Sequence, residues 1–158
     1  MKKIFTLIMC LAVLQSTMAQ DNKVIKVNFS KVRLEFMLDA AGKPIYSIYY
    51  GEKPVIKPSA MGFTLANDSA LDKGFALTGS EQTSVDESWK PVWGEVSSIR
   101  NHYQQLTVHL KQQNSSGRLM NIIFRVFEDG VGFRYEFPTQ RNLKYFIVSD
   151  ELTSFNLA

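Results

Sequence analysis

The chain has 158 residues, a single cysteine and a formal net charge of +3 at pH 7. That length is enough for one domain with its own hydrophobic core. Two of the positive charges are Lys2 and Lys3, so the chain beyond them carries a formal charge of +1 and no polybasic run. This composition excludes nucleic acid as the expected partner.

The first 19 residues have the pattern of a bacterial secretory signal peptide. Lys2 and Lys3 precede a short apolar run over Ile4–Leu14, and Thr17–Ala19 supplies small residues before a cleavage site. The alternatives are a buried N-terminal helix or a membrane anchor. The apolar run is about half as long as a bilayer span requires, and no stop-transfer segment follows it. We therefore predict a signal peptide at residues 1–19, no membrane span, and export.

The only cysteine, Cys10, lies within this predicted signal peptide. A lipoprotein interpretation is disfavoured because Cys10 sits inside the apolar run and follows Met9, which is not a small residue. Cleavage before Gln20 removes the cysteine from the mature domain, which we place at residues 20–158. That domain then has no disulfide, no thiol nucleophile and no cysteine ligand for a metal, so its core alone must stabilise it.

The first half of the mature domain alternates apolar and polar residues, as half-buried β-strands do. The alternation predicts, in chain order, strands over 24–29, 32–38 and 45–50, an extended segment over 54–58 and a short strand over 61–65. Turn-forming residues over 40–44 and 51–53 separate the strands. The polar stretch over 67–74 is predicted to be a loop.

The second half has a strand over 106–110, in which the three apolar residues share one face and Thr107 and His109 share the other. A turn follows over 114–117, and the last strand is predicted over 145–148. The clearest hairpin signal is the Asp129-Gly130 pair. A two-residue turn there sets the following pairs: Val126 with Phe133, Phe124 with Tyr135, and Ile122 with Phe137.

This register makes one face of the hairpin wholly apolar or aromatic. The other face carries Arg125, Arg134 and Glu136, with Glu136 diagonal to Arg125, so the charges also agree with the register. No amphipathic helix of ten residues or more is found. Short strands with turns between them predict an all-β fold, a β-sandwich of mostly antiparallel strands.

The residue types that carry catalysis or bind metals are present but badly placed. Neighbouring residues of a strand point to opposite faces, so adjacent carboxylates do not form an acid and base pair. Three such pairs occur: Asp86-Glu87, Glu128-Asp129 and Asp150-Glu151. His102 and His109 are seven residues apart, on opposite faces and roughly 23 Å apart on a straight strand. No serine-nucleophile or phosphate-binding motif is found, and we predict no catalytic residue, metal ligand or cofactor in this chain.

The segment over 85–103 is unusual because it holds both tryptophans beside several planar polar groups. Carbohydrate sites combine a flat aromatic face for the sugar ring with polar groups for its hydroxyls. Trp89 or Trp93 suits the first role, and four residues suit the second: Glu95, Arg100, Asn101 and His102. The alternative is that the tryptophans lie in the core and the polar groups hold a long loop together.

The sequence resembles the N-terminal domain of glycoside hydrolase family 97 in three stretches: 86–95 (DESWKPVWGE), 99–103 (IRNHY) and 124–138 (FRVFEDGVGFRYEFP). The likeness runs from about Lys31 to Ala158. The family contains α-glucosidases and α-galactosidases of glycan-using Gram-negative bacteria. The resemblance implies an N-terminal β-super-sandwich that precedes a catalytic (β/α)₈ barrel and a small C-terminal β domain, with location in the periplasm.

The same resemblance implies that the barrel carries the catalytic carboxylates, with calcium beside them and an α-linked oligosaccharide as substrate. We expect the chain to stop before that barrel and to be inactive alone, so no catalytic or calcium-binding role is transferred to it. The matching residues that could pack on the barrel or wall its substrate pocket are Trp93, Glu95, Arg100, Asn101 and His102. Two other interpretations stay open: a stand-alone periplasmic carbohydrate-binding module, and a structural protein that holds a partner through its aromatic face.

Overall fold

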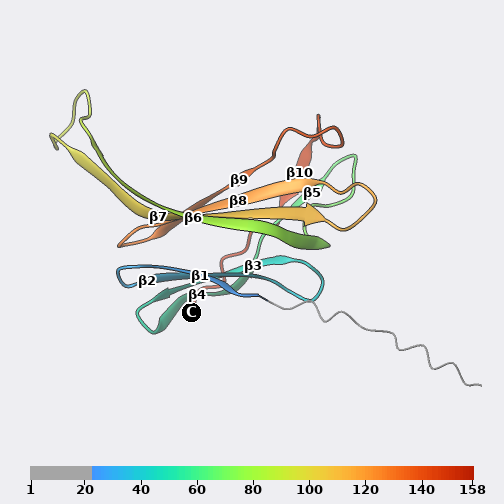
Figure 1. Cartoon of the computed structure of the whole chain (residues 1–158), viewed down its shortest axis with the longest axis horizontal. Coiled ribbons are helices and arrows are strands. Elements are labelled where there is room, and N and C mark those ends of the chain that lie inside the picture. Colours follow the sequence, from blue (N-terminus) through green and yellow to red (C-terminus); the bar gives the residue numbers. More distant parts are fainter. Residues whose placement is uncertain (1–22) are drawn as a thin grey trace, which may run out of the picture.

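The computed structural model describes residues 23–158, and these form ten β-strands and no helix (Figure 1). The all-β prediction is confirmed, and the predicted signal peptide lies outside the described residues. The strands, in chain order, are β1 Ile25–Phe29, β2 Val32–Leu38, β3 Pro44–Tyr50, β4 Lys53–Ala60, β5 Phe63–Leu65, β6 Phe75–Trp89, β7 Ile99–Gln112, β8 Leu119–Val126, β9 Val131–Glu136 and β10 Val148–Glu151. No helix in residues 23–158 is long and apolar enough to cross a membrane.

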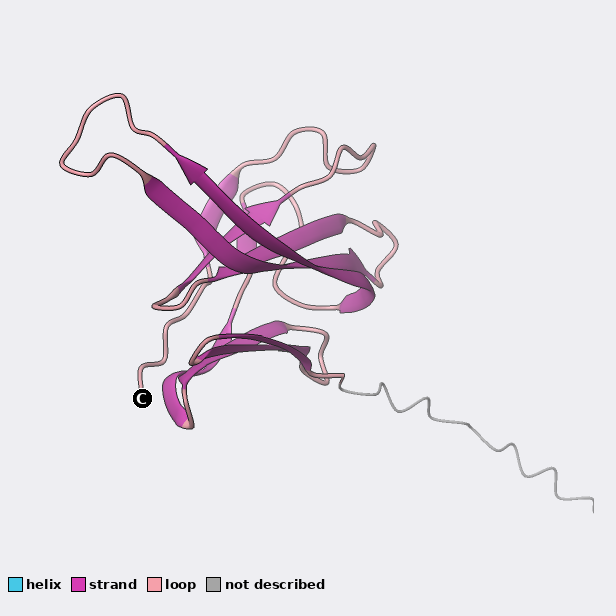
Figure 2. Cartoon of the chain, turned by 60° about the vertical axis from the view of Figure 1, so that its left-hand side comes forward, coloured by secondary structure: helices cyan, strands magenta, loops and turns pink. Residues whose placement is uncertain are grey.

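The strands form two layers that face each other, as Figures 1 and 2 show. One layer is the sheet β1-β2-β3-β4, and the other is the sheet β6-β7-β8-β9, with all neighbours antiparallel. β5 pairs with β10, and Phe63 of β5 packs edge-on against Tyr135 of β9 with ring centroids 4.4 Å apart. The short pair therefore extends the core beside β9.

The core lies between the layers because the strands alternate in burial, as half-buried strands do. On β2 the side chains of Leu34 and Phe36 are buried, while Glu35 between them faces outward. On β8 Phe124 is fully buried, with its ring 5.9 Å from Phe36 and 6.3 Å from Tyr46 across the layers. This aromatic contact joins the two sheets at their centre.

The predicted hairpin exists, but its register differs by two residues. β8 pairs with β9 through Phe124↔Phe133 and Val126↔Val131, so the connecting loop has four residues rather than two. Phe127 and Gly130 follow the same register within the loop, since the N–H of Phe127 donates to the carbonyl of Gly130 at 2.8 Å. The ring of Phe127 packs 5.2 Å from the ring of Tyr103, the residue of β7 beside it.

A shift of two residues preserves the faces, because the side-chain period of a strand is two. Phe124 is therefore buried and Arg134 exposed, as predicted. The predicted contact between Glu136 and Arg125 is wrong. Arg125 lies opposite Gly132, and Glu136 accepts a hydrogen bond from Asn121 at 3.2 Å.

Two strands differ from the sequence-based assignment. The longest strand, β6, was not predicted, because most of it is exposed on both faces and has no apolar alternation. The last strand was placed over 145–148, but β10 begins at Val148 and the residues before it form a loop. The carbonyl of Ile147 still accepts from the N–H of Ala66, the residue directly after β5, at 2.9 Å.

Residues 153–158, called here the C-terminal strap, run from the end of the β5–β10 pair to the edge of β4 (Figure 1). The N–H of Ser154 donates to the carbonyl of Ala60 at 2.9 Å, and the N–H of Lys57 donates to the carbonyl of Asn156 at 2.8 Å. An antiparallel bridge also joins Ile56 and Leu157. The strap therefore satisfies backbone groups of β4 that would otherwise be an open sheet edge.

Side chains fix the strap to the core. The hydroxyl of Tyr46 donates to the carbonyl of Ser154 at 2.9 Å. The ring of Phe155 lies 6.4 Å from Tyr46 and 6.3 Å from Phe133, so it contacts aromatic residues of both layers.

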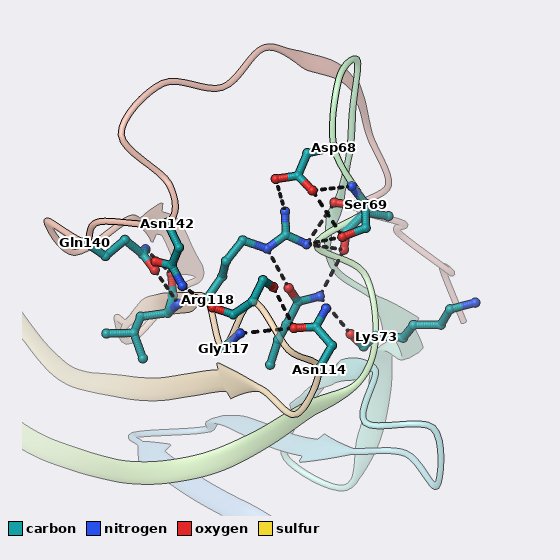
Figure 3. Close-up of polar contacts among 12 residues, drawn as sticks. Asp68, Ser69, Lys73, Asn114, Gly117, Arg118, Gln140 and Asn142 are labelled. Atoms are coloured by element: carbon teal, nitrogen blue, oxygen red, sulfur yellow. Dashed lines mark hydrogen bonds and ion pairs between the residues drawn. The ribbon is translucent and has the colours of Figure 1, made fainter.

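A buried arginine joins the loop before β6 to the turn between β7 and β8 (Figure 3). Arg118 is completely buried, and its Nε donates to Oε1 of Gln112 at 2.8 Å. Its Nη2 donates to the carbonyls of Ser69 and Ala70, at 2.9 and 3.2 Å. Its Nη1 lies 3.0 Å from the carboxylate of Asp68. The loop that the sequence predicts over 67–74 is thus held by one guanidinium.

Candidate functional site

The residues singled out from the sequence lie on one long ribbon. From Gly79 onward β6 pairs continuously with β7 to the end, where Trp89 lies opposite Ile99. The far half of the ribbon projects beyond the sandwich, with the loop over 90–98 at its tip (Figures 1 and 2). Little of the far half can be buried there, which explains the polar composition of β6.

Both tryptophans are exposed at this projecting end. Trp93 is 90% exposed and Trp89 is 52% exposed, and the neighbouring Val92 and Val96 are also exposed. These four residues are called the apolar tip. The interpretation that the tryptophans belong to the core is therefore wrong. Glu95 lies in the same loop and is exposed.

The three polar candidates on β7 do not act together, because neighbouring strand residues point to opposite faces. Arg100 binds Asp86 through two hydrogen bonds, Nε to Oδ1 at 2.7 Å and Nη2 to Oδ2 at 2.6 Å. Asn101 binds Glu87 on the other face, with Nδ2 2.7 Å from Oε1. His102 returns to the first face, and its Nε2 is 4.0 Å from Asp86.

These pairs connect β6 to β7 on both faces of the ribbon and so stiffen it. The two hydrogen bonds from Arg100 hold the pKa of the Asp86 carboxyl below its ordinary value, and the charges of Arg100 and His102 act in the same direction. The same contact raises the pKa of Arg100. Both groups are therefore charged at neutral pH.

Acidification should loosen the end of the ribbon. A carboxyl whose pKa is lower in the folded state stabilises that state at higher pH, and this contribution is lost as the pH falls through the folded pKa. We expect amide hydrogen exchange near Trp89 and Ile99 to accelerate as the pH falls through the lowered pKa of Asp86, beyond the intrinsic pH dependence of exchange. The Asp86→Asn variant should lack this added step. An identical step in that variant would assign it to another group.

A hollow of about 290 Å³ lies beside Arg100 and His102. Its other walls come from the turn between β8 and β9, namely Phe127, Glu128 and Asp129. The ring of His102 packs edge-on against Phe29 at 4.8 Å, which fixes its orientation. The sequence analysis missed the three turn residues, since the predicted two-residue turn gave no reason to place them beside the ribbon. The hollow presents a guanidinium, an imidazole and two carboxylates, groups that can bind hydroxyls.

Within residues 23–158, no three side chains of histidine, cysteine, aspartate or glutamate lie close enough together to hold a metal ion. His109 faces away from His102 and lies 2.9 Å from Oδ1 of Asn121 and 3.7 Å from the carboxylate of Glu81. Asp86 and Glu87 bind partners on opposite faces, so this adjacent pair does not converge on one substrate.

Comparison with known proteins gives a consistent result. Residues 22–158 match the family model described as glycosyl-hydrolase 97 N-terminal. The retaining α-galactosidase of Bacteroides thetaiotaomicron is 27% identical over 135 residues, which is 85% of this chain and 19% of that protein.

Solved structures show the same relationship. A glycoside hydrolase family 97 enzyme from Pseudoalteromonas sp. strain K8, solved with panose and with acarbose, is 29% identical with a TM-score of 0.78, over 85% of this chain and 20% of that one. A β-arabinopyranosidase is also 29% identical, with a TM-score of 0.75, over 88% of this chain and 22% of that one. The chain therefore spans about a fifth of the length of these relatives.

Proposed function

Since the chain belongs to the glycosyl-hydrolase 97 family, as its N-terminal domain, we propose that it is the β-sandwich that packs on the catalytic (β/α)₈ barrel of an exported α-glycosidase. In this role the ribbon of β6 and β7 reaches over the barrel and forms part of the wall of its substrate pocket. The carbohydrate would be an α-linked oligosaccharide bound by the whole enzyme.

The observation that carries this proposal is the apolar tip. Single exposed apolar residues are common on proteins, but exposed aromatic groups gathered at one site mark interaction surfaces. Trp93 is 90% exposed at the end of a ribbon whose strands are joined on both faces. A stiff support with an unpartnered aromatic end is suited to docking on another domain.

The relatives support the choice of partner. The chain corresponds to about a fifth of each of them, so four fifths of each lies outside the matched part. We assign catalysis to that remainder, because glycoside hydrolysis needs two carboxyl groups on either side of the scissile bond. The chain alone should not hydrolyse aryl α-glucosides or α-galactosides.

The calcium expected for the whole enzyme is not assigned to side chains of this chain, because residues 23–158 contain no group of three suitable ligands. Export to the periplasm of a Gram-negative bacterium is proposed from the sequence pattern of residues 1–19. The bacterial α-galactosidase and the panose complex agree with an α-glycosidase role.

Docking through the apolar tip predicts the behaviour of the isolated chain. It should self-associate in analytical ultracentrifugation and bind a dye that fluoresces on apolar surfaces. Replacing Val92 and Trp93 by serine should reduce both effects. Tyr145→Ser is the matched control, since Tyr145 is 92% exposed on a loop elsewhere and should change neither. A monomer that binds no dye at high concentration would contradict the proposal.

The second candidate function is a stand-alone carbohydrate-binding module. It is favoured by the flat exposed ring of Trp93 and by the polar hollow beside Arg100. Calorimetric titration with panose separates the two functions. Docking predicts no saturable binding by the chain alone, whereas binding that is lost in Trp93→Ala would favour the module.

A further inference from the structure

A second hollow lies on the outer face of the β6–β9 sheet, turned away from the core. Its volume is about 300 Å³, and its floor includes Ile123, which is only 6% exposed. Gly132 on β9 lies opposite Arg125 on β8, and a Cβ at Gly132 would have no atom within 4 Å. The missing side chain of Gly132 therefore leaves open space above an apolar floor, beside the ring of Phe127.

Two guanidinium groups line this hollow, and no carboxylate does. Arg134 lies opposite Ile123, which places it diagonal to Arg125 on the same face. Diagonal neighbours of a sheet lie about 7–8 Å apart, within reach of long side chains, so the two guanidinium groups can converge on one anion. Among residues 23–158 the ionic partner of Arg134 is Glu136, at a long 3.5 Å, and Arg134 is 63% exposed.

Arg125 is held in place by neutral groups. Its guanidinium lies 4.7 Å from the ring centre of Tyr103, and its Nε donates to Oε1 of Gln105 at 3.2 Å. Neither contact neutralises its charge. A guanidinium stacked on an aromatic ring keeps its remaining N–H donors in a fixed plane, the geometry that binds a carboxylate through two hydrogen bonds.

We propose that this hollow binds a small carboxylate-bearing molecule with an apolar face. The carboxylate lies between Arg125 and Arg134, and the body of the molecule rests on Ile123 and Phe127 in the space left by Gly132. This site is distinct from the docking of the apolar tip, since its lining residues belong to the body of the sandwich.

The test uses the isolated chain and its backbone amide signals in NMR. Glucuronate is the probe, glucose is its neutral counterpart with the same ring, and sulfate is a plain oxyanion. We expect glucuronate to shift the amides of Ile123, Phe127 and Gly132 in a saturable way that weakens with added salt. Glucose should not shift them. Binding of glucose as strong as that of glucuronate, or no binding of glucuronate, would overturn the proposal.

Sulfate and two variants separate the parts of the site. If sulfate shifts the same amides and binds as tightly as glucuronate, the site is a plain anion site. That result would overturn the proposed role of the apolar floor. Arg134→Gln should weaken glucuronate binding by about tenfold, as for loss of a charge-assisted hydrogen bond. Gly132→Leu should abolish binding by filling the hollow. Arg141→Gln removes the same charge at an exposed position elsewhere and should leave binding unchanged.

If Gly132→Leu fails to fold, glucuronate binding by Arg134→Gln still tests the proposal. Arg134 is exposed, so its replacement leaves the core intact. Unchanged binding in Arg134→Gln would overturn the proposal.

Discussion

Replacing Arg118 by alanine is expected to lower the free energy of unfolding by about 3–5 kcal/mol. The guanidinium is completely buried, so its removal leaves a cavity and takes a hydrogen-bond donor away from several partners. Four groups would lose this donor (Figure 3): Oε1 of Gln112, the carbonyls of Ser69 and Ala70, and the carboxylate of Asp68, which is itself 47% exposed.

Urea unfolding followed by circular dichroism measures this change. The control is Arg141→Ala, which removes an exposed arginine and should change stability by no more than about 0.5 kcal/mol. A loss below about 1 kcal/mol in Arg118→Ala would mean that water replaces the guanidinium. We also expect amide hydrogen exchange to become faster in residues 68–73 of Arg118→Ala, because Arg118 holds this loop. If water replaces the guanidinium, that acceleration should be absent.

Truncating Phe124 to alanine should also cost about 3–5 kcal/mol. Phe124 is fully buried, and its ring contacts Phe36, Tyr46 and Phe133, so its removal opens a cavity between the layers. The same change at Phe133 should cost less, because Phe133 is only partly buried.

Unfolding of both variants in urea provides the comparison, with Tyr145→Ala as the exposed control. Equal losses at Phe124 and Phe133 would contradict the difference in burial. A small loss at Phe124 would show that the two sheets can close over the cavity.

Much of the sandwich could be predicted because its strands follow simple alternation. β2 and the second half of β7, from Leu106 to Gln112, bury every second residue, and the faces of the β8–β9 hairpin are as expected. The register was wrong because the sequence signal places the Asp129-Gly130 pair at the centre of the turn, whereas the hydrogen bond from Phe127 to Gly130 centres it on Glu128 and Asp129. Arg118 was missed for a related reason, since arginine is ordinarily a surface residue.

The candidate site was harder to predict because it lies on a strand without apolar alternation. Once β6 is paired with β7, Asp86 and Glu87 fall beside Arg100 and Asn101. The available signal for this ribbon was the opposite charges of Asp86 and Arg100, seven residues on either side of Trp93. The exposure of Trp93 depends on how far the ribbon projects, which no local pattern encodes.

The C-terminal strap also imposes an order on folding. Ala60 and its partner Ser154 are 94 positions apart, and contacts of such separation form late. Until the strap docks, β4 has an unpaired edge, the feature through which chains aggregate.

β4 has its own protection for this period. Lys53 and Lys57 add charge to this edge strand, and charge there disfavours pairing with another chain. The lysine content of this strand therefore protects the chain before the strap has docked.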